Sequence, residues 1–325
     1  MNPFPFLPRS IRALIPAALL LQLSIAAADK SQLHFTYDTN FSKTAGSHTL
    51  GACHGGAAID KAGQIHVTTD TPSGIAIFSA DGKFLRAVGP SHIHALEIVE
   101  QTGNQLIYAA RPSKHEVVIL NLAGEVQHTI KAPMESGLFK DANAFNPCAV
   151  TVAPDGSIYV ADGYGSNYVL KYDKDRKFVK AFGGPGEAEG KFKTCHGIAY
   201  DPRHKNLLVC NRNNNRVEHW DLDGKFIRVI QKDLRMPAAV HIRGDYALLP
   251  ELQGRVTLLD KAGNIAAQLG DQPNEKHRAN YGLPPADWKP GIVNSPHGGS
   301  LDANGNIIIT EWSQFGRLHK WLRTP

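Results

Sequence analysis

A four-part pattern over residues 195–230 constrains the fold more than any other feature of this sequence. Four short apolar runs, at 195–201, 207–212, 216–221 and 225–230, are separated by turn sequences rich in Asn, Asp and Gly. Runs of this length between such turns predict antiparallel strands. Four strands in about 40 residues form a unit that cannot bury its apolar faces alone, so it is expected to stack against copies of itself as a propeller blade.

The same pattern recurs along the chain, with first strands starting near residues 54, 94, 148, 196, 238 and 297. Asp81-Gly82, Asp155-Gly156, Asp223-Gly224 and Asn304-Gly305 mark hairpins between the apolar runs. The sequence therefore predicts an all-β, six-bladed β-propeller as a single domain over residues 29–325. The last repeat runs out of chain before a fourth strand. We expect the alternating segment 32–37 to pair onto that blade and close the ring, covering an exposed edge.

The first 28 residues have a different character. Arg9 and Arg12 precede an apolar run at 13–25 that ends in small residues, which is typical of a signal peptide. The run is shorter than the roughly 20 residues of a spanning helix. We expect a mature chain that starts near Asp29, has no membrane span, is monomeric, and is secreted or periplasmic. Its net charge of +5 is scattered, which argues against a nucleic-acid partner.

The chain has four cysteines: Cys53, Cys148, Cys195 and Cys210. Cys195 and Cys210 fall near opposite positions of one predicted hairpin. An oxidising compartment would permit a disulfide between them. A reduced pair fits the sequence equally well.

Histidines recur at the starts of the predicted first strands. Aligning these strands places six residues around the mouth of the central channel: His54 or Gly55, His94, Cys148, His196, Ala238 and His297. His94, His196 and His297 stand on alternate blades, about 120° apart in a six-bladed ring. Three converging imidazoles with room for another ligand are typical of a catalytic Zn²⁺ or related divalent site. The alternative is that these histidines only make structural hydrogen bonds. His54 and Cys148 are further candidate ligands, whereas His66, His115, His204, His219, His241 and His319 fit ordinary strand or turn positions.

The surplus residues of the repeats lie at 132–146, 184–194 and 270–295, each before a first strand. Loops entering first strands share a face with the turns after second strands, so function is expected on that rim. Two of these turns carry Tyr164 and Arg212. Arg212 is suited to bind a carboxylate, and Tyr164, beside a metal and an arginine, is expected to have a lowered pKa and act as a base. Asp70, Asp162 and Glu251 are expected to satisfy loop backbone.

The repeat elements resemble those of the NHL-repeat propellers, and most closely the peptidyl-α-hydroxyglycine α-amidating lyases. This resemblance covers roughly residues 50–320. It implies a zinc ion on His94, His196 and His297, which stand in Pro-His-Gly-like strand starts. It also implies a catalytic tyrosine at Tyr164, in the turn Asp162-Gly163-Tyr164, a substrate-binding arginine at Arg212, and a structural calcium ion.

The sequence departs from that family at defined positions. Thr69-Asp70 stands where the family has a second catalytic arginine, and Gly165 replaces a disulfide cysteine. Gly298 stands where an acidic residue would help to hold calcium, and Tyr168 replaces another arginine. Arg111, one blade along, is a candidate substitute for the lost catalytic arginine.

The sequence thus predicts an extracytoplasmic metal-dependent carbon–nitrogen lyase that takes a small-molecule or peptide substrate at the channel mouth. The resemblance implies that such an enzyme cleaves peptidyl-α-hydroxyglycine to a peptide amide and glyoxylate. Two alternatives stay open. One is a non-catalytic propeller that binds a peptide, glycan or protein on the same rim, and the other is a different hydrolase or lyase using the same three histidines.

Overall fold

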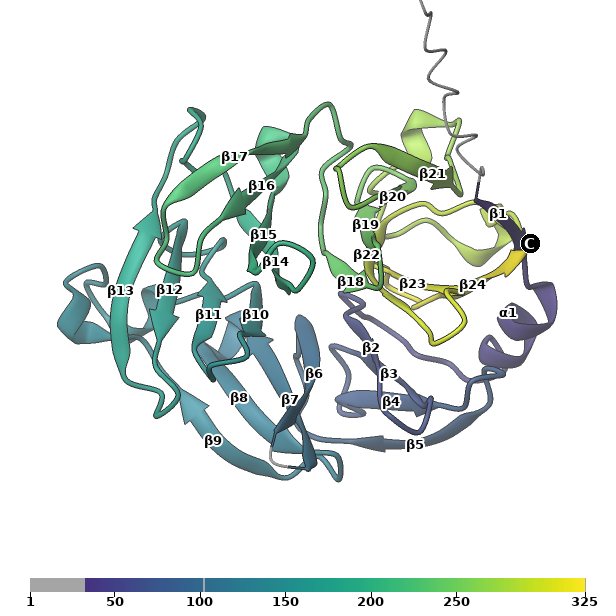
Figure 1. Cartoon of the computed structure of the whole chain (residues 1–325). Coiled ribbons are helices and arrows are strands. Elements are labelled where there is room, and N and C mark those ends of the chain that lie inside the picture. Colours follow the sequence, from purple (N-terminus) through teal and green to yellow (C-terminus); the bar gives the residue numbers. More distant parts are fainter. Residues whose placement is uncertain (1–32, 102, 325) are drawn as a thin grey trace, which may run out of the picture. The chain divides into compact units, whose positions relative to one another are not determined.

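The computed structural model describes residues 33–101 and 103–324, which form six four-stranded antiparallel sheets. Each innermost strand contacts the innermost strands of both neighbouring sheets, so the sheets surround a central channel (Figure 1). The predicted six-bladed β-propeller is confirmed. The signal peptide predicted for residues 1–28 lies outside the described residues.

The strands follow one another within each blade from the channel outward. Blades one to three comprise β2 (Ala57–Ile59), β3 (Ile65–Thr68), β4 (Ile75–Phe78), β5 (Phe84–Val88), β6 (Ala95–Gln101), β7 (Asn104–Arg111), β8 (Glu116–Asn121), β9 (Val126–Ile130), β10 (Ala149–Val152), β11 (Ile158–Ala161), β12 (Tyr168–Tyr172) and β13 (Phe178–Gly183). Blades four to six comprise β14 (Cys195–Asp201), β15 (Asn206–Asn211), β16 (Arg216–Trp220), β17 (Phe226–Gln231), β18 (His241–Arg243), β19 (Tyr246–Glu251), β20 (Arg255–Leu259), β21 (Ile265–Leu269), β22 (Pro296–Leu301), β23 (Ile307–Glu311) and β24 (Leu318–Thr324). Short 3₁₀ turns occur at η1 (Pro112–Lys114), η2 (Met134–Ser136), η3 (Ala142–Ala144), η4 (Arg212–Asn214), η5 (Glu275–His277) and η6 (Pro285–Asp287).

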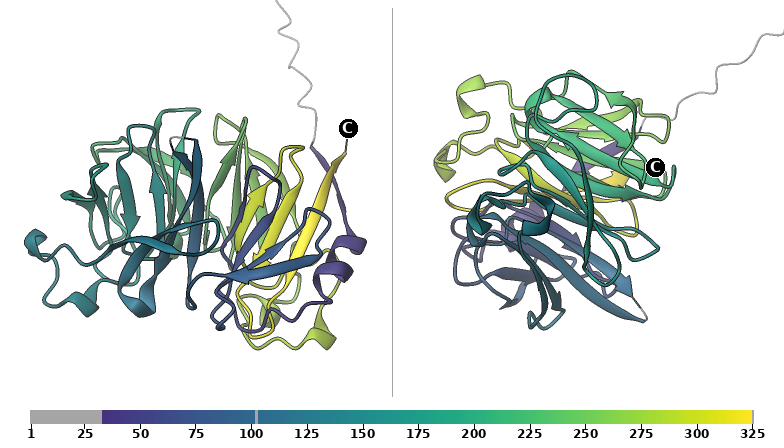
Figure 2. Two further views of the ribbon diagram at one scale, coloured as in Figure 1. Left: turned by 90° about the horizontal axis from the view of Figure 1, so that it is seen from below. Right: turned by 90° about the vertical axis from the view of Figure 1, so that its left-hand side faces the viewer.

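The outermost strand of blade six comes from the other end of the domain. Strand β1 (His34–Tyr37) pairs antiparallel with β24, from His34 opposite Thr324 to Tyr37 opposite Trp321. The hydroxyl of Tyr37 lies 3.2 Å from Nδ1 of His319, and its ring meets Trp321 edge-on at 5.2 Å. Figure 2 shows β1 beside β24 in the left-hand view. The edge of β24 is thus covered by a strand of the same chain.

A short helix that the repeat pattern did not predict, α1 (Thr39–Ala45), follows β1. The carboxylate of Asp38 caps it by accepting hydrogen bonds from the backbone N–H groups of Asn40 and Phe41. Phe41 is 2% exposed and packs in the core beside blade one. Two turns of helix carry too few apolar positions to give a recognisable period in the sequence.

The core is divided into clusters between neighbouring sheets. In one of them Ile119, Phe145 and Tyr172 bring together residues of blades two and three. In another, Leu248 of blade five meets Ile309 and Trp321 of blade six. Buried apolar surface of this kind stabilises by about 25 cal/mol per Å², so each blade depends on both neighbours and the channel mouth is held by packed sheets.

The possible disulfide between Cys195 and Cys210 is not formed, and all four cysteines are free and buried. A β-bulge places Cys195 opposite Asn211 and Cys210 opposite Gly197. Cys195 packs in the cluster shared with blade three, whereas Cys210 packs in the cluster shared with blade five. The two side chains therefore point to opposite faces of one sheet, which a disulfide cannot span.

Among the described residues, none of the helices has the length and apolar character needed to cross a bilayer.

Candidate functional site

Three histidines meet at the channel mouth from alternate blades. His94 directly precedes β6, His196 lies in β14, and His297 lies in β22. Their ring centroids are 4.8 to 4.9 Å apart, and one nitrogen from each ring lies within 4.8 Å of the other two. All three are buried. The structure therefore brings together the three side chains that the sequence predicts as metal ligands.

Backbone carbonyls orient two of the rings. Nδ1 of His94 donates to the carbonyl of Cys148 at 2.7 Å, and Nδ1 of His196 donates to that of Ala238 at 2.6 Å. Because a carbonyl only accepts, Nδ1 carries the proton and Nε2 presents a lone pair to its surroundings. This is the usual arrangement of a metal-binding histidine, whose other nitrogen is held by a backbone or carboxylate oxygen.

The third ring, that of His297, has no such hydrogen bond among the described residues. The backbone carbonyl of Gly55, in the next blade, instead accepts a hydrogen bond from the hydroxyl of Thr310. Nε2 of His297 is buried and has no hydrogen-bond partner among the described residues. Burial lowers the pKa of all three imidazoles well below the usual value, so they are neutral at pH 7. Neutral imidazoles and an orphaned buried nitrogen fit a bound divalent transition metal.

A calcium ion held as in the lyase family does not fit. Position 298 would have to supply the acidic side chain, yet a Cβ on Gly298 would lie 1.9 Å from the carbonyl oxygen of Gly55. That distance is far below any non-bonded contact, so no side chain is accommodated here without movement of the backbone. Glycine permits the close approach of blades six and one.

Tyr164 and Arg212 lie directly beside the three histidines. The phenolic oxygen of Tyr164 is 2.9 Å from Nε2 of His196 and 3.3 Å from Nε2 of His94. The guanidinium of Arg212 donates to the same oxygen at 3.1 Å and sits over the ring. Both residues therefore join the site for which the sequence proposes them.

Without a metal ion the pKa of Tyr164 is raised, and the lowering expected beside a bound metal ion stays a prediction. Burial raises the pKa of Tyr164 to about 12, and the nearby Cys148 thiol acts in the same direction. The Arg212 guanidinium favours the phenolate but does not outweigh these effects.

The insertions hold the turns that carry these side chains. The backbone N–H of Tyr164 donates to the carbonyl of Asn146 at 3.3 Å, and the Asn146 N–H donates to the Asp162 carboxylate at 2.6 Å. Gln314, two residues after Trp312, donates to the carbonyl of Tyr281 at 3.0 Å. Each of these contacts joins a rim turn to the insertion that enters its own blade. This is the expected gathering of insertions on one rim.

Blade one can be aligned with the other blades by a shared backbone contact or by its strand pairing, and the two differ by one residue. The N–H groups of four rim residues donate to the carbonyl two positions before the ring residue of the same blade, in the pairs Asp70 to Ala52, Arg212 to Thr194, Leu252 to Met236, and Trp312 to Ser295. Counted from this contact, His54 corresponds to His196 and His297. Counted from the strand pairing, in which Gly56 lies opposite Thr68 as Gly197 lies opposite Cys210 and Gly298 opposite Thr310, the equivalent residue is Gly55. Blade one thus has one extra residue here, and His54 is the one whose side chain lines the pocket. By the shared backbone contact, Asp70 corresponds to Arg212.

The pocket above the histidines has a volume of about 160 Å³. Its lining consists of His54, Tyr164, Arg212, Leu252, His297 and Trp312. Trp312 stands in a turn after a second strand, Glu311-Trp312, where the repeat pattern expects rim residues, and Leu252 is the one member that sequence reasoning missed. Its signal is positional, because Leu252 follows Glu251 at the end of a second strand as Arg212 follows Asn211.

Two further candidates are not part of the site. Arg111 is paired with Glu116 and donates through Nε to the carbonyl of Ser91 at 3.1 Å. It does not line the described pocket, so it does not replace the lost arginine. The Cys148 carbonyl accepts a hydrogen bond from His94, whereas its thiol lies outside the group of nitrogen atoms that could hold a metal ion.

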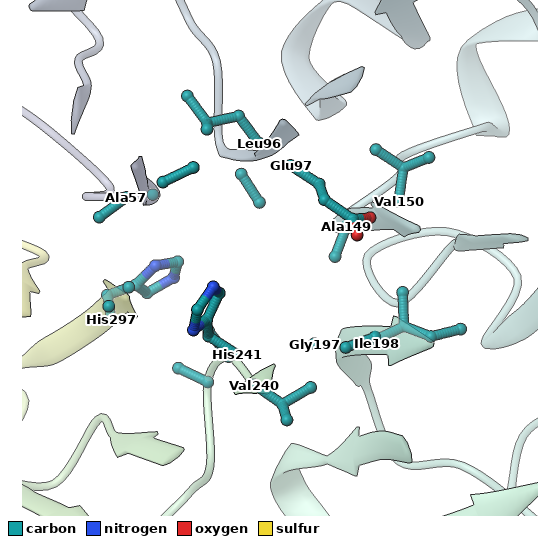
Figure 3. A pocket seen from close by; sticks show the side chains of 18 of the residues that line it. Ala57, Leu96, Glu97, Ala149, Val150, Gly197, Ile198, Val240, His241 and His297 are labelled. Atoms are coloured by element: carbon teal, nitrogen blue, oxygen red, sulfur yellow. The ribbon is translucent and has the colours of Figure 1, made fainter. Parts of the chain in front are cut away.

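The channel continues beneath the three histidines as a cavity of about 260 Å³ lined by the first strands (Figure 3). Figure 3 shows Glu97 and His241 on its wall. His241, expected to be an ordinary strand residue, accepts a hydrogen bond at Nδ1 from the Leu301 N–H at 3.2 Å. Burial raises the pKa of Glu97 to about 7 and lowers that of His241 to about 4. Both shifts disfavour the charged forms of these two side chains.

Another compact His and Asp group lies at a turn of blade four. Asp201, His204 and His219 bring their polar atoms within 4.8 Å of one another. Arg203, however, holds both oxygens of the Asp201 carboxylate at 2.8 Å. A cation there would face this guanidinium, so the group is a structural hydrogen-bond cluster.

Comparison with known proteins gives a short sequence match and a wide structural one. Over 98 residues the chain is 33% identical to "Peptidylglycine alpha-amidating monooxygenase" of Rattus norvegicus and 32% identical to the Mus musculus enzyme. The match covers 28% of this chain and 10% of each relative. The chain thus spans about a tenth of the length of the curated relatives it matches. No family model matches the sequence.

Several solved propellers share the fold. A streptogramin B lyase has a TM-score of 0.58 and 14% identity, covering 90% of this chain and 97% of its own. The virginiamycin B lyase of Staphylococcus aureus has a TM-score of 0.58 and 12% identity, covering 89% and 99%. A protein provisionally assigned as a gluconolactonase has a TM-score of 0.60 and 14% identity, covering 85% and 91%. At these identities the likeness establishes the fold alone.

Proposed function

We propose that this protein is a metal-dependent carbon–nitrogen lyase that acts on α-hydroxyglycine compounds outside the cytoplasm. The observation that carries the proposal is the junction of His94, His196 and His297 with Tyr164 and Arg212 at one pocket. The partial sequence match to the amidating enzymes supports the reaction class. The apolar run at 13–25, typical of a signal peptide, supports the location.

In this proposal each residue of the pocket has a separate task. The three neutral histidines hold the metal through nitrogen lone pairs. A divalent cation bound there supplies Lewis acidity and positive charge, which favours ionised oxygen atoms nearby, including that of Tyr164. Arg212 binds the substrate carboxylate through guanidinium N–H groups that do not contact Tyr164. Trp312 and Leu252 exclude water from the apolar side of the substrate.

The reaction needs one proton to leave an oxygen and one to reach a nitrogen. The substrate hydroxyl loses its proton, its oxygen forms the carbonyl of glyoxylate, and the carbon–nitrogen bond breaks with its electron pair going to nitrogen. The nitrogen then takes up a proton and becomes an amide. Tyr164 lies within hydrogen-bond distance of two of the histidines and is positioned to accept the first proton and return it.

The test is glyoxylate release from α-hydroxyhippurate by zinc- or cobalt-loaded protein, measured beside a Tyr164→Phe variant. Release by the native protein that is lost in the variant supports the proposal. Tyr168→Phe is the matched control, since Tyr168 lies in the same blade but outside the pocket lining. Absence of release from metal-loaded native protein would exclude this substrate class.

A non-catalytic binding propeller is the second candidate. One observation favours it: Asp70 stands at the position corresponding to Arg212, where the lyase family has an arginine. The resemblance gives that arginine a catalytic role in the lyase family, so its loss removes a group that the reaction would need. In this case the rim would bind its ligand without cleaving it.

A further inference from the structure

The pocket contains a fourth histidine that is held by a carboxylate. Nδ1 of His54 lies 2.9 Å from the Asp70 carboxylate, and the side chain of His54 is one-third exposed at the pocket. The ring lies 4.9 Å from that of His94 and 5.9 Å from that of His297. His54 therefore occupies the blade-one place in the ring, between the two metal-binding blades that flank it.

His54 is not placed as a metal ligand. The nitrogen atoms of His94, His196 and His297 gather within 4.8 Å of one another, and no nitrogen of His54 belongs to that group. His54 does line the pocket together with Arg212 and His297. Its ring is thus beside the space over the metal site, where a bound ligand would lie.

Asp70 determines what this ring offers to a ligand. A carboxylate accepts hydrogen bonds and cannot donate, so the Nδ1 atom of His54 that faces Asp70 carries a proton. In the neutral imidazole the remaining atom, Nε2, is then an acceptor directed away from Asp70. It complements a ligand group that donates a hydrogen bond. Arg212 offers only donors and complements a carboxylate.

We propose that the His54–Asp70 pair is a specificity determinant that selects α-hydroxy acids: Nε2 of His54 accepts a hydrogen bond from the ligand hydroxyl while Arg212 binds its carboxylate. This inference rests on the proposed function in placing the ligand over the three histidines. It adds a residue and a recognition rule that the lyase resemblance does not contain, since the family has an arginine where Asp70 stands. His54 acts on binding, and Asp70 acts through His54 as a positioning residue.

The experiment compares two small ligands that differ in one hydrogen-bond donor. Glycolate carries a hydroxyl, and methoxyacetate has the same carboxylate with that hydroxyl capped by a methyl group. Their dissociation constants are measured on cobalt-loaded protein from the change in the cobalt visible spectrum. We expect His54→Ala to weaken glycolate binding about five- to tenfold, as for loss of one hydrogen bond, and to leave methoxyacetate binding unchanged. Asp70→Leu should also weaken glycolate binding, by a smaller factor.

Controls separate recognition from general damage. His204→Ala removes a partly exposed histidine at the β14–β15 turn, at the opposite end of its blade, and should leave both dissociation constants unchanged. His54→Gln provides a second variant if the alanine form does not fold. Equal weakening of both ligands, or loss of cobalt from a folded His54 variant, would overturn the proposal. Because binding is measured without turnover, a protein that releases no glyoxylate but shows the expected ligand preference would contradict only the lyase reaction.

Discussion

The phenolic oxygen of Tyr164 lies 2.9 Å from Nε2 of His196, although the two residues come from neighbouring blades. The carbonyl of Ala238 holds the other nitrogen of that ring, and Arg212 holds the phenol. The groups that we propose for proton transfer and carboxylate binding thus share one hydrogen-bonded unit with two of the three proposed metal ligands, His94 and His196. Substitutions in this unit should therefore alter activity, and loss of the strand pairing that keeps the ring intact should alter stability.

Tyr164→Phe should reduce glyoxylate release from α-hydroxyhippurate by roughly 10² to 10⁴-fold, the usual contribution of a positioned proton-transfer group. The metal content should not change, because a phenylalanine ring fills the same space and the three histidines remain. Activity is followed by a glyoxylate assay and metal by mass spectrometry. Activity equal to that of Tyr168→Phe would show that Tyr164 is not catalytic.

Arg212→Ala should lower kcat/KM about tenfold to a hundredfold, since a hydrogen-bonded charged partner of the substrate is removed. Arg212→Lys keeps the positive charge but loses the two-pronged geometry, so it should recover only part of the loss. The same kcat/KM values are then measured on a substrate whose carboxylate has been converted to an amide. If Arg212→Ala lowers kcat/KM by the same factor on both substrates, Arg212 does not bind the carboxylate.

Deleting residues 33–38 should destabilise the last blade. The deletion removes β1 and exposes the backbone of β24 as an unpaired edge, together with the faces of His319 and Trp321 that Tyr37 covers. We expect aggregation or a lower melting temperature, measured by size-exclusion chromatography and thermal denaturation. Tyr37→Phe, which keeps the strand and loses one hydroxyl, is the milder control. A deletion variant that stays soluble with an unchanged melting temperature would contradict the role of β1.

The stability of the fold should fall on acidification, in part through His319. Burial, helped by the Arg317 guanidinium, lowers the pKa of His319 to about 4, although Glu311 opposes the shift. Tyr37 and Glu311 are its hydrogen-bond partners. A histidine in the unfolded chain titrates near pH 6.5. Between about pH 6.5 and 4 the unfolded state therefore binds a proton that the folded state does not, and stability decreases as the pH is lowered.

His319→Gln should remove up to about 3 kcal/mol of that pH dependence. The measurement is urea unfolding at pH 7 and at pH 4, with native and variant proteins in the same metal state. His204→Gln, at a partly exposed turn, should keep the native dependence. If the free energy of unfolding of His319→Gln changes between pH 7 and pH 4 as much as that of the native protein, this histidine is not held neutral by the fold.

The repeat made the architecture and the three central histidines predictable, because apolar runs and turns recur at blade spacing and the ring residues recur with them. Blade one was ambiguous by one residue, since Gly55 and Gly56 offer no side chains to align. The structure resolves this through an extra residue in blade one, which brings the His54 side chain beside His94 and His297. The pairing of His54 with Asp70 spans a whole hairpin and leaves no local signal.

Other features depend on where side chains point, and the sequence does not specify that directly. Cys195 and Cys210 fall near each other along a hairpin, but the bulge at His196 sends them to opposite faces. The lowered pKa expected for Tyr164 depends on a bound metal as well as on Arg212, and without the metal the effect of burial outweighs that of Arg212. Burial is a property of the assembled rim, because it depends on insertions that are far apart in the chain.

Metal content is the most direct test of the central claim. Mass spectrometry of purified protein, after incubation with zinc and removal of excess ions, should find about one equivalent per chain, as expected for a single three-histidine site. A folded variant with His94, His196 and His297 changed to alanine should bind none, whereas His204→Ala should bind as the native protein does. Native protein that stays metal-free after this treatment, or a triple variant that retains the metal, would contradict the account.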